Sequence, residues 1–278
     1  MFSLETLFVP AWWLYLVAFG FGVIIGSFLN VYIYRFHTGK SLSGHSHCLS
    51  CAYPLKWYDL FPLLSYLFLR GRCRVCGCHI TSRYFWVELA TGLLFALTLT
   101  LTYDLLTIGL FWFMLAVLVV ITVYDYYHYI IPDSLTLVLT CAVCLLSAYD
   151  YFIFQTDQSV MITNVLAALG GSGFFLFLWV LSKGKWLGFG DVKLAFPLGL
   201  VVGAKLVFSF VVLSFWIGAA VSLTIIGYEK MNRGKAHLHL VSTNLTMKSA
   251  VPFAPFLVAS SLVVLFTHFN VLELFSSI

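Results

Sequence analysis

The stretch over residues 188–193 (GFGDVK) places an ionisable side chain, Asp191, at the junction of two long apolar runs. Ionisable side chains at membrane depth are costly, so they usually face a partner or a water-filled cavity and indicate function. The two glycines allow a tight turn and the close approach of another segment. A plain loop with Asp191 as a helix N-cap explains the same residues locally. A dinucleotide-binding loop is poorly supported, because Lys193 stands where its third glycine belongs.

The composition around this stretch is typical of a membrane protein with many spans. Of the 278 residues, 62% are hydrophobic and only 9% are charged, which is too apolar for a soluble domain. A spanning helix needs about 20 apolar residues. Eight segments approach that length, namely residues 10–34, 85–103, 105–124, 130–149, 160–182, 192–202, 206–228 and 251–269. We therefore expect an all-α polytopic membrane protein of about eight transmembrane helices, the sixth of them short. We expect no cleavable signal peptide, because the first run is long and lacks a basic flank before it.

The basic residues of the predicted loops indicate how the chain is oriented. They are Arg35, Lys40, Lys56, Arg70, Arg72, Arg74 and Arg83 after the first span, Lys183 and Lys185 before the sixth, and Lys230, Arg233, Lys235 and Lys248 before the last. With eight spans these loops share one side, which the positive-inside rule makes cytoplasmic. The other side keeps Lys205 and an acidic loop around Asp150 and Asp157. The net charge of +4 is then a topology signal, and we expect no nucleic-acid partner.

Two cysteine pairs lie in the polar loop over residues 36–82. The pairs are Cys48 with Cys51 and Cys73 with Cys76, with 21 residues between them. This spacing is typical of a tetrahedral zinc site, and four thiolates leave no open position for water, so the metal would be structural. A disulfide pair is the alternative, although the cytoplasmic side is reducing. Cys78 and His79 follow the second pair and could compete as ligands.

Three aspartates stand at the predicted cytoplasmic ends of spans. Asp125 ends the third span, Asp133 begins the fourth, and Asp191 begins the sixth. Two carboxyl groups at one depth can form an aspartic dyad, in which close like charges share one proton. One carboxylate then activates water while the protonated partner polarises a peptide carbonyl. Asp133 competes for the first position, but its place after Pro132 suits an N-terminal dipole partner of the fourth span.

An ordered set of motifs carries a family resemblance. The motifs are residues 26–31 (GSFLNV), the four loop cysteines, 63–66 (LLSY), 69–73 (LRGRC), 83–84 (RY), 87–89 (VEL), 125–133, 188–193, 252–253 (PF) and 255–257 (PFL). In this order they resemble the type IV prepilin peptidases, which are membrane aspartic peptidases of the Gly-x-Gly-Asp kind. Any single motif is weak, whereas the ordered set is specific.

The resemblance implies two activities and their site. The family cleaves the basic leader of prepilins and pseudopilins at the cytoplasmic face of the bacterial inner membrane, and then methylates the new N-terminal amine from S-adenosylmethionine. The residues carried over by position are Asp125 and Asp191 for catalysis, Gly188, Gly190 and Lys193 as motif support, and Cys48, Cys51, Cys73 and Cys76 for zinc. The chain departs from the family at Tyr127, where many relatives have aspartate, and at Ala254, where many have glycine.

The resemblance also implies a domain order. We expect a first transmembrane helix over residues 1–35, a cytoplasmic zinc-binding loop domain with four cysteine ligands over 36–82, and a transmembrane aspartic peptidase core over 83–278. The implied partners are prepilin and pseudopilin substrates and membrane lipids. The methyl-donor pocket and the oligomeric state stay open. A proton-coupled transporter with membrane aspartates and a zinc-bearing scaffold remain as alternatives.

The orientation predicts which positions are reachable from outside. We expect a thiol reagent that cannot cross the membrane to label Asp157→Cys and not Lys235→Cys, because the basic loops stay inside. Labelling of intact cells measures this. The reverse pattern would contradict the predicted orientation.

Overall fold

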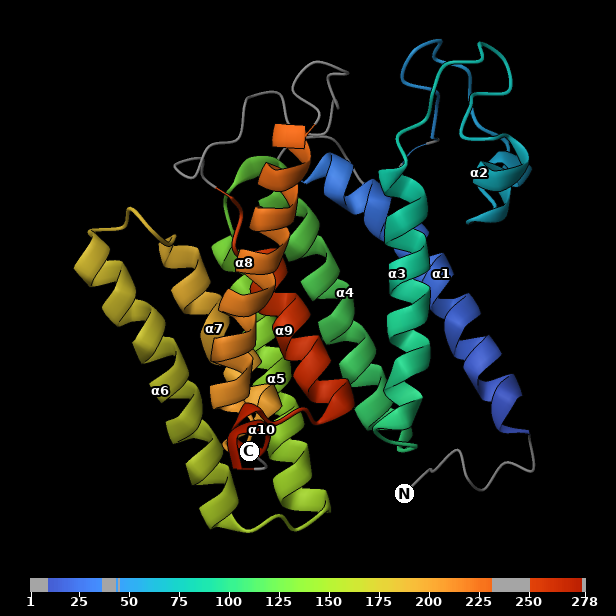
Figure 1. The fold of residues 1–278 in the computed structure, drawn as a ribbon. Helices are drawn as coiled ribbons and strands as arrows, with labels where there is room; N and C mark the ends of the chain where they lie inside the picture. Colours follow the sequence, from blue (N-terminus) through green and yellow to red (C-terminus); the bar gives the residue numbers. More distant parts are fainter. Residues whose placement is uncertain (1–9, 37–43, 45, 232–250, 277–278) are drawn as a thin grey trace. The chain divides into compact units, whose positions relative to one another are not determined.

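The chain is a bundle of helices in the computed structural model, which describes residues 10–36, 44, 46–231 and 251–276. The helices are α1 (Ala11–Arg35), α2 (Leu64–Phe68), α3 (Arg83–Leu97), α4 (Leu105–His128), α5 (Asp133–Ile153), α6 (Gln158–Ser182), α7 (Phe189–Val202), α8 (Val207–Met231), α9 (Ala254–Thr267) and α10 (Val271–Ser276), with 3₁₀ turns η2 (Trp57–Asp59) and η3 (Thr98–Thr100) (Figure 1). Two isolated bridges are the only strand-like pairings within these ranges.

The predicted all-α polytopic membrane fold is confirmed. Each of the eight predicted segments coincides with one helix, α1 or one of α3 to α9. Among the described helices, five are long and apolar enough to cross a membrane: α1, α4, α5, α6 and the Val207–Tyr228 part of α8. The other three, α3, α7 and α9, have 15, 14 and 14 residues, fewer than the roughly 20 that a full span needs.

The chain divides into two compact units, Met1–Val120 and Ile121–Ile278, with the boundary inside α4. In the first unit α1 packs along α3, and glycines on both helices explain the close approach (Figure 1). A Cβ added at Gly22 would lie 2.7 Å from the Thr91 carbonyl oxygen, and one at Gly26 would lie 2.8 Å from the Glu88 Cα. Small residues four apart let helix backbones approach closely. In lipid this close packing matters, because apolar side chains gain no hydrophobic free energy by exchanging lipid contacts for contacts with another helix.

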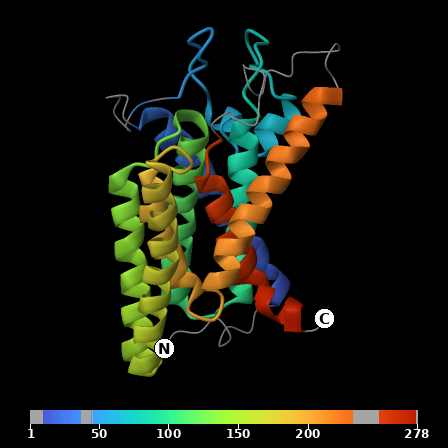
Figure 2. The same cartoon turned by 60° about the vertical axis from the view of Figure 1, so that its left-hand side comes forward.

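In the second unit the short helix α7 is the central element. It packs against α6, α9 and α5, and α6 runs beside it in Figures 1 and 2. Nine of its 14 residues are buried, whereas 22% of the spanning window of α6 is buried. Because protein surrounds α7, its length need not match the thickness of the hydrocarbon layer. The expected short sixth span is therefore an interior helix.

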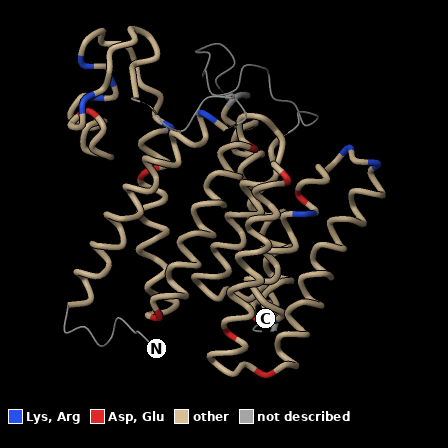
Figure 3. The backbone as a smooth tube through the Cα atoms, turned by 180° about the vertical axis from the view of Figure 1, so that it is seen from behind, with Lys and Arg blue, Asp and Glu red and all other residues tan. Residues whose placement is uncertain are grey.

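Residues of opposite charge flank the two ends of α6 (Figure 3). Asp157 is the residue before this helix and Lys183 the residue after it, so roughly 37 Å of helix separates them. Asp150 belongs to the last turn of α5, which continues to Ile153, so it is not in a loop as expected. Lys40, Arg233, Lys235, Lys248 and the side chain of Lys230 lie outside the described residues.

The α1–α3 contact predicts a difference between two glycines of the same helix. Gly26→Ala should lower the thermal midpoint of the purified protein, because overpacking a close contact costs about 1–3 kcal/mol. Gly20→Ala should leave it unchanged or raise it, because a Cβ at Gly20 would have no atom within 4 Å. Thermal unfolding in detergent, followed by tryptophan fluorescence, measures both. Equal shifts for the two variants would show that this contact does not depend on glycine.

Candidate active site and cysteine cluster

Asp125 lies in the last turn of α4 and is buried, with 5% of its surface exposed. Its Oδ2 accepts a hydrogen bond of 3.2 Å from the backbone N–H of Ala254, the first residue of α9. The amides at a helix N-terminus favour an anionic partner. The family pattern has glycine at position 254. Here alanine fits, since Ala254 is fully buried and its amide still faces the carboxylate.

Asp191 is the third residue of α7 and is also buried, with 6% of its surface exposed. Its Oδ2 accepts a hydrogen bond of 3.1 Å from the backbone N–H of Gly188, the N-cap residue. Its Oδ1 is buried and has no hydrogen-bond partner among the described residues. Leaving a buried acceptor without a donor costs about 1–3 kcal/mol, so this oxygen indicates a site for water or a substrate.

Both carboxyl groups belong to the unit Ile121–Ile278, and the charge of Asp125 acts on Asp191. One comes from the end of α4 and the other from the start of α7. Two buried acids from different helices, each with one oxygen held by a backbone amide, form the arrangement that acid–base hydrolysis requires.

The two glycines of the GFGD stretch make room for neighbouring atoms. A Cβ at Gly190 would lie 2.9 Å from the Cβ of Ile131, a buried residue between α4 and α5. A Cβ at Gly188 would lie 3.3 Å from Oδ2 of Asp191. Gly188 has φ −74°, which any residue adopts, and Gly190 lies inside helix α7. The close approach of another segment, one of the two expected roles, is therefore the role of Gly190, whereas Gly188 lies against Asp191 of its own segment.

Asp133 lies outside the buried pair. Its Oδ1 contacts Nζ of Lys193 at 2.7 Å, and 75% of its side chain is exposed. It is the acidic residue in the first turn of α5, as expected for a dipole partner. Lys193 thus connects the start of α7 to the start of α5, by an exposed ion pair of the kind that contributes about 0–1 kcal/mol.

The cysteine loop contains two equivalent small hairpins. In the first, the N–H of Cys48 donates to the carbonyl of Tyr53 and the N–H of Ala52 to that of Cys48. In the second, the N–H of Cys73 donates to the carbonyl of Cys78 and the N–H of Gly77 to that of Cys73. Ala52 and Gly77 share a positive φ, 58° and 68°. By this equivalence Cys51 matches Cys76, whereas Cys78 matches Tyr53.

The sulfur atoms of the two hairpins converge. Four of them, those of Cys48, Cys73, Cys76 and Cys78, lie within 4.8 Å of one another. This set contains Cys78 in place of the expected Cys51, whose thiol interacts with those of Cys48, Cys76 and Cys73. Backbone hydrogen bonds from Cys51 and Ser50 lower the pKa of the Cys48 thiol to about 6, and those from Cys76 and Val75 lower the pKa of Cys73. Four cysteine sulfurs this close together are soft donors, so this donor set fits a soft cation.

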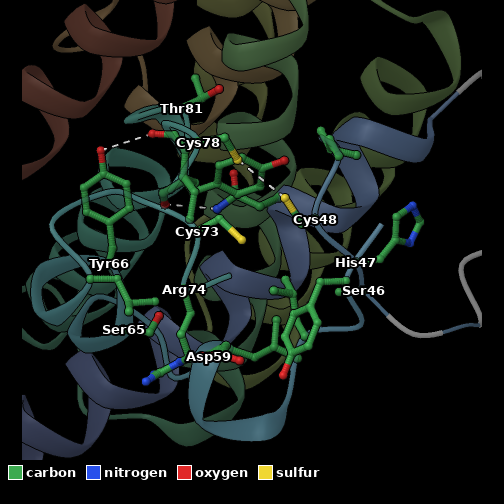
Figure 4. A pocket seen from close by; sticks show the side chains of 18 of the residues that line it. Ser46, His47, Cys48, Asp59, Ser65, Tyr66, Cys73, Arg74, Cys78 and Thr81 are labelled. Carbon is green, nitrogen blue, oxygen red and sulfur yellow. Dashed lines mark hydrogen bonds and ion pairs between the residues drawn. The ribbon is translucent and has the colours of Figure 1, made fainter. Parts of the chain in front are cut away.

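A cavity of about 250 Å³ lies in the first unit, between the hairpins and helices α1 and α3 (Figure 4). The Cys48, Cys73 and Cys78 side chains line it, and so does Glu88 of α3. Glu88 is buried, and its Oε2 accepts a hydrogen bond of 2.8 Å from the backbone N–H of Leu63. The sequence motifs contain Glu88, but nothing in their spacing shows that it holds the loop to the helix.

Comparison with known proteins identifies relatives of this chain. Residues 21–102 match the bacterial peptidase A24 N-terminal domain, and residues 110–223 match the type IV leader peptidase family. Relatives named prepilin leader peptidase/N-methyltransferase come from Klebsiella pneumoniae (34% identical; 66% of this chain and 82% of the relative) and Aeromonas hydrophila (30%; 88% of each). One from Myxococcus xanthus is 41% identical over 48% of this chain, and the match spans only 40% of that relative.

No solved structure matches the chain. The two family matches together run from residue 21 to residue 223 with a short gap, and include Asp125, Asp191 and the cysteine loop. The Aeromonas relative aligns over most of its own length at 30% identity. On these grounds the chain belongs to the type IV leader peptidase family.

Proposed function

We propose that this membrane protein is a bifunctional enzyme that cleaves the leader peptide of prepilins and methylates the N-terminal amine that cleavage exposes. The relatives that match along most of the chain are named for both activities. The convergence of Asp125 and Asp191 carries the peptidase assignment. The family resemblance extends the substrates to pseudopilins, and we propose Gly188, Gly190 and Lys193 as support for the pair.

We propose different tasks for the two oxygens of each carboxyl group. The amides of Ala254 and Gly188 hold Oδ2 of Asp125 and Oδ2 of Asp191, which supports a role for the second oxygens toward the reactants. One carboxylate takes a proton from water, and the water oxygen bonds to the peptide carbonyl carbon. The protonated partner donates its proton to the carbonyl oxygen. Collapse of the tetrahedral intermediate breaks the C–N bond, and the leaving amine takes up a proton.

We propose that the aspartate end of the second unit faces the cytoplasm of a bacterial inner membrane. The ends of α4 and α7 that carry Asp125 and Asp191 adjoin the connection with Lys183 and Lys185, while Asp157 lies at the far end of α6. Basic residues stay inside. A short basic leader would remain on the same side and reach the carboxyl pair. Membrane lipids would cover the exposed apolar side chains of α6.

For the cysteine loop we propose one structural zinc ion, held by Cys48, Cys51, Cys73 and Cys76. The equivalence of the two hairpins supports this set, because each hairpin then contributes the same two positions. Cys78 is the nearest competitor, since its Sγ lies 3.5 Å from that of Cys48. A metal here would lock residues 36–82 into a domain between the helix at 1–35 and the peptidase core at 83–278, because a loop of this size is too small to hold itself together otherwise. S-adenosylmethionine is the methyl donor we propose.

The transporter alternative finds no support. The relatives that cover most of this chain are named as peptidases with methyltransferase activity. The two buried aspartates stand at the end of one helix and the start of another, and the charge of Asp125 acts on Asp191. A hydrolytic pair accounts for their position more directly.

The carboxyl pair predicts that neither aspartate can be replaced. Asp125→Asn and Asp191→Asn should each slow leader cleavage by at least about a hundredfold, because one group must accept a proton and the other donate one. Glutamate at either position should also nearly abolish cleavage, since the added methylene moves the carboxyl by about an ångström. Cleavage of a leader-bearing prepilin by purified enzyme in detergent measures these rates.

Two controls accompany the aspartate variants. Asp133→Asn should keep substantial activity, because that carboxyl is exposed and outside the buried pair. Methylation of a pre-cleaved pilin should continue in Asp125→Asn and Asp191→Asn, which shows that they are folded. Cleavage at the normal rate by Asp191→Asn would contradict the proposal that this protein is an aspartic peptidase.

The cysteine cluster predicts which thiols hold metal. Replacing Cys48, Cys51, Cys73 or Cys76 by serine should lower the zinc content of the purified protein, whereas Cys78→Ser should keep it. Elemental analysis measures the zinc per chain, with Cys141→Ser in α5 as the matched control at an exposed cysteine. We expect cleavage to survive these replacements better than methylation. Loss of zinc in Cys78→Ser but not in Cys51→Ser would show that Cys78, and not Cys51, is the fourth ligand.

A further inference from the structure

The cavity of the first unit is lined by none of the residues that we propose for peptide cleavage. Its lining residues come from α1, from the two cysteine hairpins, from the segment around α2, and from α3. All of them lie within Met1–Val120. The volume of about 250 Å³ is far larger than the roughly 30 Å³ that one water occupies. It is slightly smaller than the roughly 300 Å³ at which the volumes of small-molecule pockets begin. The cavity therefore has the size of a ligand site.

One buried polar atom in its wall has no partner. Asn30 of α1 is 1% exposed, and its Nδ2 donates a hydrogen bond of 3.1 Å to the carbonyl oxygen of Tyr84. Its Oδ1 is buried and accepts no hydrogen bond from any residue that the structure describes. An acceptor of this kind is costly unless a donor reaches it. Because Asn30 lines the cavity, a ligand with an N–H or O–H group is the missing donor.

The remaining wall defines the chemistry of that ligand. Glu88 contributes a buried carboxylate, which favours a cationic group nearby. The rings of Tyr53, Tyr66 and Tyr84 offer flat apolar surfaces for a planar base. Figure 4 shows Cys48 and Cys78 facing one another on the cavity wall, with Tyr66 on another side. A ligand with an aromatic base, donor groups and a positive charge fits these walls.

We propose that this cavity binds S-adenosylmethionine, with Asn30 Oδ1 accepting a hydrogen bond from the ligand and the Glu88 carboxylate facing its cationic part. The inference rests on the proposed methyltransferase function and gives that function a place and residues. In the transfer, the lone pair of the substrate amine forms the new N–C bond, and the S–CH₃ bond breaks. The bonding electrons stay on sulfur as a neutral thioether, and the methylated ammonium releases one proton to water.

Binding to the full-length protein in detergent tests the site directly. The probe is S-adenosylhomocysteine, the unreactive product, measured by equilibrium dialysis. Asn30→Leu should raise its dissociation constant about tenfold or more, because a buried hydrogen bond is lost. Phe28→Leu, on the same helix at a position that does not line the cavity, should leave it unchanged. Leader cleavage should continue in both variants and serves as the folding check.

A second pair of variants avoids the buried helix contact. Thr81→Trp, at an exposed position that lines the cavity, should block binding by filling the space. Ser82→Trp, at the exposed neighbouring position that does not line it, should bind normally. Photolabelling with 8-azido-S-adenosylmethionine should mark peptides of residues 27–35, 46–55 or 78–88. Labels confined to residues 121–278 would overturn the proposed location.

The outcomes separate the site from the function. Wild-type protein that neither binds S-adenosylhomocysteine nor methylates a cleaved prepilin would contradict the methyltransferase function itself. Wild-type binding and methylation, with unchanged binding by Asn30→Leu and Thr81→Trp, would contradict only the cavity. If Thr81→Trp instead loses a co-purified lipid while probe binding is unchanged, the cavity is a lipid site and the proposal is wrong.

Discussion

The second unit depends on the hydrogen bonds that backbone amides donate to two buried carboxyl groups. A carboxylate removed from water is stable only where donors replace its hydration. Here the donors are the amides of Gly188 and Ala254, both at the starts of helices. Helix starts are the places where backbone N–H groups lack partners within the helix. Each aspartate therefore provides an acceptor for a backbone amide at the start of a helix, and that amide replaces part of the hydration of the carboxyl group.

The hydrogen bonds between helix starts and aspartates account for where helix α7 begins and for the glycine beside Asp191. Helix α7 begins where Asp191 needs an amide, and it is short because protein rather than lipid surrounds it. Gly190 lacks a side chain because Ile131, six residues after Asp125, occupies that space. The GFGD stretch is thus a packing requirement as much as a chemical one. Gly190, which makes room for Ile131, directly precedes Asp191, so the packing and the proposed chemistry depend on neighbouring residues of the same stretch.

The first unit relies on close contact of a different kind. Glycines bring α1 against α3, and the segment between the two hairpins is held to α3 by the carboxylate of Glu88, which accepts a hydrogen bond from Leu63. Neither hairpin has enough apolar surface to form a core of its own, so the thiol cluster and the contact with α3 must hold it in place. The cavity lies where these parts meet, and among the described residues the Asn30 oxygen in its wall has no partner. On the functions and the ligand that we propose, cleavage and methylation would be served by different units of one chain.

The sequence alone determined the class of the protein and the residues worth testing. Long apolar runs can only become helices in lipid, because every backbone group must be satisfied within the segment. The isolated aspartates stand out because ionisable side chains are costly in an apolar chain unless they have a task. The CxxC pairs stand out by their spacing, which is typical of a zinc site. The eight apolar segments were therefore recognisable as helices, while the catalytic role of Asp125 and Asp191 stays a prediction.

Only the tertiary structure decided which groups surround those residues. The donor to Asp125 is 129 positions away in the chain, and no local pattern identifies it. The helices are apolar on all sides, so no polar stripe shows which face of each helix meets its neighbour. The Oδ1 of Asn30, which has no partner among the described residues, was hidden for the same reason, whereas the sequence had already offered Cys78 as a competing ligand. The sequence shows which side chains must find partners, and packing between distant helices selects the partners.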